Sequence, residues 1–533
     1  MCASGSAVEH LLAKEGVAGS IPVSRFYDES IKYLERYLML FGLWECMDLD
    51  NEGGKGMNKK ALLKPSGVDL LHGPIFGPMF RFAMPLFLSS IFQQLYNMAD
   101  TVIVGHTLGD TALAAMGAAT PAYDLLIGFA FGIGGGLSLV TARSYGSKDE
   151  NLLKRSVASS LVIGAVITLV LTLLTRAIIT PFLKLLNTPP EIIGEAYQYV
   201  STITLFMGVM FAYNLCAGML RAIGNSVMPL VFLVISSITN IVLDILFIRH
   251  LNMGIVGAAA ATVIAQGLSV VLCLIYIVKK ARILIPEKKH FAFDAGLYKE
   301  MTAQGLSMAL MHCLVSAGSA ILQAGINNLG YLIIAGHTAA RKLYQLGMML
   351  FSAMTQTVST FVSQNRGANQ VGRIRKAMKS AYLYNACATL AITVFLWIFA
   401  PFMVRLISGS SETVVLENGA RYLRVVAPFY FVLGLVNCTR NALQAIGQKI
   451  LPLGSSIIEL IGKILFAALL IPKYKYAAVI FCEPIIWCLM AVELLIAFWK
   501  NPYIKAGREK KTMPETKTEQ GEKLFPEKNE TRE

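Results

Sequence analysis

The stretch Ile91-Phe-Gln-Gln-Leu-Tyr-Asn-Met-Ala-Asp-Thr-Val-Ile-Val-Gly105 is apolar enough to cross a membrane, yet it carries Asp100 in its second half. Gln93, Asn97 and Asp100 follow one another at i, i+4 and i+7, so a helix places them on one face. A carboxylate inside a bilayer costs several kcal/mol unless it faces a bundle interior or a water-filled cavity. Asp100 is therefore a candidate functional residue. The alternative is a capping or pairing role inside the bundle.

The composition is that of a membrane protein with many spans. Of the 533 residues, 55% are hydrophobic and only 15% are charged, whereas soluble proteins average about 25% charged residues. The net charge of +14 does not indicate nucleic-acid binding, because Lys and Arg fall mostly between the apolar runs and in the tails. That distribution fits loops held at an anionic cytoplasmic leaflet and contact with membrane lipid.

Twelve apolar segments have the length of a span. Only helices or closed barrels satisfy the backbone in lipid, so we expect an all-α polytopic protein with twelve transmembrane helices. The predicted segments are residues 79–105, 118–142, 156–180, 196–218, 227–249, 254–278, 303–327, 339–364, 380–403, 419–441, 450–471 and 477–499.

The connections between these segments predict the orientation. Those after the second, sixth and eighth segments are rich in Lys and Arg, whereas the one from His106 to Gly117 has neither. Positively charged loops stay inside. We therefore expect a multi-pass protein of the cell membrane with both termini in the cytoplasm.

The chain also divides along its length. Residues 1–70 mix charged and small residues, and Met57 resembles an ordinary chain start, so 1–56 are interpreted as a non-native extension, or else as a lateral amphipathic helix. The tail lacks periodicity, which predicts disorder. The expected units are an extension over 1–70, a six-helix lobe over 75–280, a linker over 281–300, a second lobe over 301–500 and a charged tail over 501–533.

The two lobes are expected because the chain repeats itself. Leu220-Arg-Ala-Ile-Gly-Asn-Ser-Val-Met-Pro229 matches Leu443-Gln-Ala-Ile-Gly-Gln-Lys-Ile-Leu-Pro452, which lies 223 positions later. Leu108-Gly109 matches Leu329-Gly330, and Tyr145-Gly146 matches Arg366-Gly367, both 221 positions later. Six helices per repeat is an even number, so the repeats are parallel. Parallel repeats around a central cavity are an architecture of transporters.

More polar residues lie inside the first-half spans. Asn240 and Asp244 are one turn apart on one face, and Thr262 lies within an alanine-rich segment. Together with Asp100 they form a candidate cation-coupling site. Two nearby acids shielded from water do not both stay ionised, so the set suits a proton, or Na⁺ held by carboxylate, amide and hydroxyl oxygens. The alternative is an interhelical hydrogen-bond network.

The second half differs at the matching positions. Ser236 and Asn240 correspond to Glu459 and Lys463, and Asp100 corresponds to Ile321. Ion chemistry is therefore predicted in the first half alone, while Glu459 and Lys463 form a structural or substrate-lining pair. His337 and Arg341 are assigned to a loop or helix cap. The expected substrate cavity comprises Gln93, Gln94, Asn97, Gln323, Tyr344, Gln345, Gln356, Glu459 and Lys463.

Over residues 75–500 the chain resembles the multidrug and toxic compound extrusion family of transporters. The likeness is carried by Met84-Pro85, by Asn97-Met-Ala-Asp100 with Gly105 and Leu108-Gly109, by Ala114-Ala115, by the glycine-rich segment around Gly132, by Tyr145-Gly146, and by Leu220-Arg-Ala-Ile-Gly224 with its copy at 443–447. Asp100 and the Asn240/Asp244 pair resemble the prokaryotic branch named for DNA-damage-inducible protein F.

That resemblance implies two lobes around a V-shaped cavity and export of organic cations or other amphiphiles in exchange for H⁺ or Na⁺. It implies a first-lobe cation site at Asp100, Asn240, Asp244 and Thr262. The acid that another prokaryotic branch carries in the seventh helix is missing, which puts a second-lobe site in doubt. We expect a monomer without a cofactor other than the coupling ion.

Three other functions fit the sequence less well. A flippase for lipid-linked saccharides has the same architecture, but it tends to need several cationic residues in its cavity. Few Lys or Arg lie mid-span in this chain, and Lys463 is the exception. An intramembrane enzyme would need a nucleophile with its base, or metal ligands at helical spacing, and none is present, so we expect no enzyme. A channel would not need two intramembrane acids confined to one half, and no filter-like repeat occurs.

Overall fold

Helices form wherever the sequence is apolar over a spanning length. The computed structural model describes residues 67–185 and 188–506, and within these ranges there is no strand. The first half comprises α3 (Phe76–Leu108), α4 (Asp110–Gly146), α5 (Glu150–Leu185), α6 (Pro190–Leu205), α7 (Met207–Ala222), α8 (Val227–Asp244), the π-helix η2 (Ile245–His250) and α9 (Gly254–Lys280).

The second half repeats this series. Short 3₁₀ turns, η3 (Arg282–Leu284) and η4 (Lys288–Phe291), connect the halves. The second half comprises α10 (Ala295–Asn327), α11 (Tyr331–Gly367), α12 (Val371–Ser408), α13 (Thr413–Val426), η5 (Ala427–Phe429), α14 (Tyr430–Ala445), α15 (Ile450–Leu465), the π-helix η6 (Phe466–Leu470), α16 (Ile471–Tyr474) and α17 (Tyr476–Lys500).

All twelve predicted segments coincide with helix, but four of them are interrupted. The fourth is bent by 50° between α6 and α7, and the fifth ends in the π-helix η2. The tenth and eleventh, six segments later, contain the 3₁₀ turn η5 and the π-helix η6 at the matching positions. Irregularities at matching positions support the six-helix repeat.

Two of the twelve segments are unusually polar. In the part of the chain that the structure describes, nine helices are long and apolar enough to span a membrane, and the bent pair α6 and α7 makes ten. Helices α3 and α11 are long enough to span a membrane, but they are less apolar than those helices because they carry many polar residues. They pack against each other, and α3 also packs on α8 while α11 packs on α13 and α14. The two polar helices are thus packed against each other and against more apolar helices, and the chain is a multi-pass membrane protein.

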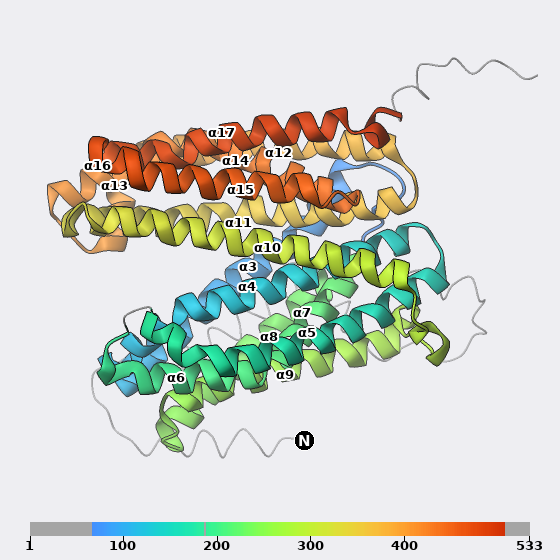
Figure 1. The fold of residues 1–533 in the computed structure, drawn as a ribbon, viewed down its shortest axis with the longest axis horizontal. Coiled ribbons are helices and arrows are strands. Elements are labelled where there is room, and N and C mark those ends of the chain that lie inside the picture. Colours follow the sequence, from blue (N-terminus) through green and yellow to red (C-terminus); the bar gives the residue numbers. More distant parts are fainter. Residues whose placement is uncertain (1–66, 186–187, 507–533) are drawn as a thin grey trace, which may run out of the picture. The chain divides into compact units, whose positions relative to one another are not determined.

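The halves meet most closely where α4 runs beside α10 (Figure 1). Side chains on Gly132 and Gly136 of α4 would overlap the backbone of Ala309 and Gly305 on α10. Small residues at four-residue spacing allow such close approach in membranes. Arg143 of α4 also pairs with Glu300 on α10, and the linker is held because Lys154 of α5 pairs with Glu287 and Arg155 with Asp294.

Both ends of the described region extend the predicted lobes. Leu70 is buried, and the Val68 N–H donates to the Gly224 carbonyl, so the final residues of the expected extension belong to the packed unit. Residues 502–506 are helical and Ile504 is buried, which corrects the expected start of the tail at 501. The rest of both predicted segments, 1–66 and 507–533, lies outside the described residues.

A reciprocal glycine contact joins α4 to α11 and yields a first prediction. Gly146 lies against the carbonyl of Gln364, and its repeat partner Gly367 lies against the carbonyl of Arg143. Gly146→Ala would force two backbones apart, so we expect a loss of about 2 kcal/mol in unfolding free energy, measured by unfolding in detergent. Gly134→Ala is the matched control on α4, since nothing lies within 4 Å of its added methyl group. Equal stability of the two variants would contradict this packing.

Candidate cation site

The four predicted cation-coupling residues lie together where α3, α8 and α9 meet. Asp100 of α3 is 8% exposed, and Asn240 and Asp244 of α8 are fully enclosed. Thr262 faces them from α9 and is also buried. The one-turn spacing of Asn240 and Asp244 directs both side chains to the same face of α8, as the sequence predicts.

Hydrogen bonds connect these residues. The Asn240 amide, in the orientation that satisfies both of its ends, donates to Asp244 Oδ2 at 2.9 Å and accepts from the Thr262 N–H at 3.2 Å. Asp100 of α3 and Asp244 of α8 are both enclosed in this cluster. Two acids shielded from water in one cluster do not both stay ionised unless a cation or proton binds there.

Two oxygen atoms of the donor set are left without partners. Oδ1 of Asp100 and Oδ1 of Asp244 are both enclosed, and neither has a hydrogen-bond partner. Buried polar atoms are normally satisfied, so each exception needs an explanation. Oxygen donors of this kind suit a hard monovalent cation or a proton. Among residues 67–185 and 188–506, no group of three or more His, Cys, Asp or Glu gathers in a metal-binding arrangement.

Tyr96 is a neighbour of the cluster that the sequence analysis missed. Its hydroxyl donates to Thr262 Oγ1 at 3.4 Å, across the gap between α3 and α9. The sequence spacing could have identified Tyr96, because it precedes Asp100 by four residues and so shares its helix face.

The matching position in the second half holds a fixed positive charge. Lys463 of α15 is only 2% exposed, and its Nζ donates to Glu459 Oε1 at 2.9 Å and to Ser319 Oγ on α10 at 3.1 Å. Arg440 of α14 lies 3.6 Å from the other oxygen of Glu459. The buried face of α15 repeats that of α8 at the 223-residue offset. An ammonium group therefore stands where the first half has the Asn240 amide.

The remaining residues of the expected cavity are less enclosed. Gln93, Asn97, Gln323, Gln345 and Gln356 are exposed, and Gln94 and Tyr344 are half-buried. Gln323 donates to Asn327 at 2.8 Å, and Tyr344 stacks on Trp487. Glu459 and Lys463 instead lie inside the second half, away from solvent.

His337 and Arg341 correct the assignment to a loop or cap. Both lie within α11, which begins at Tyr331, eight residues before the predicted start. Arg341 Nη1 donates to both oxygens of Glu483 on α17, at 2.9 and 2.8 Å, and the Tyr422 hydroxyl donates to the same carboxylate at 3.1 Å. The sequence analysis did not identify this buried network.

Comparison with known proteins agrees with this architecture. The chain is 25% identical over 395 residues to a "Probable multidrug resistance protein YoeA" of Bacillus subtilis (strain 168), covering 73% of this chain and 85% of that protein. It is 22% identical over 427 residues to "Multidrug export protein MepA" of Staphylococcus aureus (strain N315), covering 80% and 92%.

Solved structures share the fold. One described as "Crystal structure of MATE in complex with MaL6" aligns with a TM-score of 0.76 at 24% identity, covering 84% of this chain and all of that one. Another, an outward-facing MATE family transporter of the MOP superfamily, aligns at 0.73 with 23% identity, covering 84% and 98%.

The family model named MatE matches residues 85–246 and again residues 307–469. Each match falls within one half, so together they cover more than half of the chain and reproduce the internal repeat. This chain therefore belongs to the MatE family.

Proposed function

We propose that this protein is a secondary active antiporter that exports organic cations or other amphiphiles in exchange for H⁺ or Na⁺. The observation that carries the proposal is the enclosed Asp100/Asp244 pair, which two helices of one half hold against Asn240 and Thr262. The names of the bacterial relatives, a multidrug resistance protein and a multidrug export protein, support the substrate class.

Helix α3 supplies the link between ion and substrate. It packs on α8 within the first half and on α11 of the second half. Two ionised carboxylates repel each other, so α3 moves away from α8 when the pair is empty and returns when the cation neutralises it. Any such movement changes the contact of α3 with α11. A cation that binds more tightly when α3 lies close to α8 shifts the equilibrium toward that arrangement, and the size of the shift is set by the difference in affinity between the two arrangements.

The flippase alternative is less well supported. A pyrophosphate group needs cationic side chains that are free to bind it. The mid-span cations each contact a carboxylate: Arg341 pairs with Glu483, while Arg440 and Lys463 share Glu459. All three are thus engaged within the protein and none is free to bind a pyrophosphate, which favours an amphiphilic cation as substrate.

Transport into or out of vesicles tests the proposal. Right-side-out vesicles that contain the protein are loaded with a fluorescent organic cation, and Na⁺ and pH gradients are imposed separately. We expect one of the two gradients to drive transport of the dye, and its collapse by an ionophore to stop that transport. Dye movement that is indifferent to both gradients would refute antiport.

A further inference from the structure

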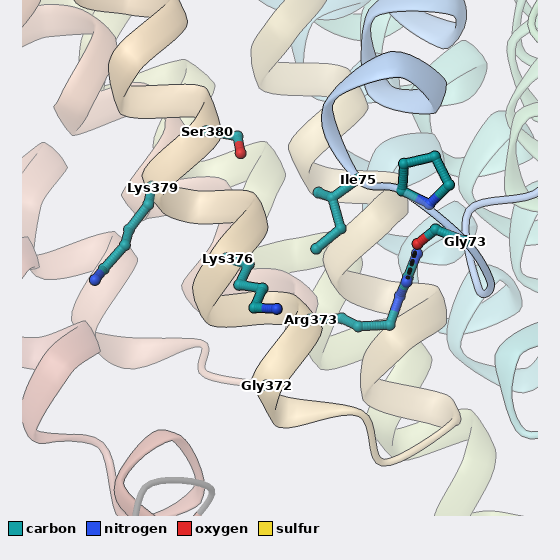
Figure 2. Close-up of a pocket in the computed structure, with 8 residues that line it drawn as sticks. Gly73, Ile75, Gly372, Arg373, Lys376, Lys379 and Ser380 are labelled. Carbon is teal, nitrogen blue, oxygen red and sulfur yellow. Dashed lines mark hydrogen bonds between the residues drawn. The ribbon is translucent and has the colours of Figure 1, made fainter.

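A hollow of about 660 Å³ opens between the first turns of α12 and the segment that leads into α3. Its walls include Gly73, Pro74 and Ile75 on one side and Arg373, Lys376 and Ser380 on the other (Figure 2). Lys379 lines it one turn along α12. The site is remote from the acidic pair, and the proposed antiport makes no use of it.

Arg373 builds one wall of this hollow and is itself occupied. Its guanidinium donates to the carbonyl of Gly73 at 2.7 Å, of Leu70 at 3.2 Å and of His72 at 3.3 Å. These bonds fix the backbone that precedes α3. Lys376 and Lys379 are exposed and have no ion-pair or hydrogen-bond partner among the described residues. Lys376 thus offers an uncompensated positive charge on the Ser380 side of the hollow, while the Lys379 side chain extends away from Gly73 and Ile75 (Figure 2).

The same face of α12 becomes apolar one turn farther on. Residues 376, 383, 390 and 397 are seven apart and therefore lie along one side of the helix. Leu383 and Leu390 are 64% and 66% exposed, and Trp397 is also exposed. α12 has 38 residues, so at 1.5 Å per residue it is about 57 Å long, whereas the hydrocarbon core is about 30 Å thick. One end of the helix thus reaches the headgroup region.

We propose that this hollow binds the headgroup of an anionic phospholipid, whose acyl chains lie along the exposed side of α12. Lys376 and Ser380 suit a phosphate diester in the hollow, Lys379 adds positive charge one turn along the helix, and the exposed Leu383 and Leu390 suit the acyl chains. A free phosphate ion would gain only the polar half of these contacts, which is why a lipid fits better. Bound lipid would also contact Gly73 to Ile75, and would thereby brace the start of the helix that carries Asp100.

Lipid titration of the full-length protein tests this site. Purified protein in neutral detergent is titrated with phosphatidylglycerol and, separately, with phosphatidylcholine, and bound lipid is counted by native mass spectrometry. Wild type should prefer phosphatidylglycerol. A basic residue near an anionic surface contributes roughly fivefold in affinity, so Lys376→Ala with Lys379→Ala should weaken phosphatidylglycerol binding by about 10- to 30-fold, with the phosphatidylcholine affinity unchanged.

A matched control separates a built site from general surface charge. Lys279 and Lys280 form another exposed lysine pair, at the linker end of the lipid-facing helix α9, so Lys279→Ala with Lys280→Ala should bind phosphatidylglycerol as wild type does. Equal losses in both double variants, or no loss in the first, would overturn the proposal. So would displacement of the lipid by inorganic phosphate at equal concentration, since that would identify a simple anion site. An unchanged thermal unfolding midpoint confirms that the variants are folded.

Discussion

Asp244→Asn is expected to reduce gradient-driven efflux by on the order of 100-fold, the upper range of coupling between two sites, while the protein still folds and inserts. Asparagine keeps the shape of the side chain, and it can still contact the Asn240 amide that bonds Asp244 Oδ2 at 2.9 Å. The asparagine side chain stays neutral, however, and cannot ionise as the Asp244 carboxyl group can. The site then carries one acid instead of two, so a bound H⁺ or Na⁺ no longer decides between repulsion and contact across α3 and α8. Efflux of a fluorescent cation from energised vesicles measures the loss.

The two acids should behave as one unit. Asp100→Asn should be as damaging as Asp244→Asn, and the double variant no worse than either, because each substitution alone already removes the switch. Asp110→Asn is the matched control, since Asp110 is an exposed acid at the start of α4 in the same half. Retained coupled efflux in either single variant would remove these residues from the mechanism. Removing one of two facing acids removes the repulsion between them, so the unfolding midpoint should not fall.

Much of the fold was predictable because lipid allows few solutions. A backbone in hydrocarbon must satisfy itself, so apolar length alone locates helices. The breaks were not predictable in this way. The 50° bend between α6 and α7 occurs at Phe206, two residues before Gly208. Hydropathy averages over such a bend, because it measures apolar content and not the backbone conformation of one residue.

The cation site was predictable for a different reason. An acid in a span is costly wherever it occurs, so Asp100 and Asp244 are conspicuous in sequence, and the one-turn spacing of Asn240 and Asp244 implies a common face. The same rule applies to Glu483, which lies in the predicted segment 477–499. Its partner Arg341 falls at the very start of the predicted segment 339–364 and was therefore assigned to a loop or helix cap, because the sequence does not show that α11 begins at Tyr331. Helix ends beyond the hydrocarbon are polar, and a search for apolar length omits them.

The Arg341–Glu483 pair therefore deserves a direct test of what it contributes. Glu483 lies deep between α11, α13 and α17, where it accepts two hydrogen bonds from Arg341 and one from the Tyr422 hydroxyl. His337 adds an edge-on ring contact with Tyr422. Three helices of the second half thus converge on one carboxylate, and the positive charge of Arg341 is balanced there.

Glu483→Gln should lower the free energy of unfolding by about 3 to 5 kcal/mol, because it leaves the Arg341 guanidinium without a counter-charge inside the bundle. Equilibrium unfolding in mixed detergent measures the loss. Glu417→Gln is the matched control on α13, where the acid is exposed, and it should change stability by less than about 0.5 kcal/mol. Adding Arg341→Met to Glu483→Gln should recover most of the loss, since the cost arises from an unpaired charge and not from missing attraction. Stability within about 1 kcal/mol of wild type for Glu483→Gln alone would mean that water reaches Arg341 and solvates it, and that this network does not hold the three helices together.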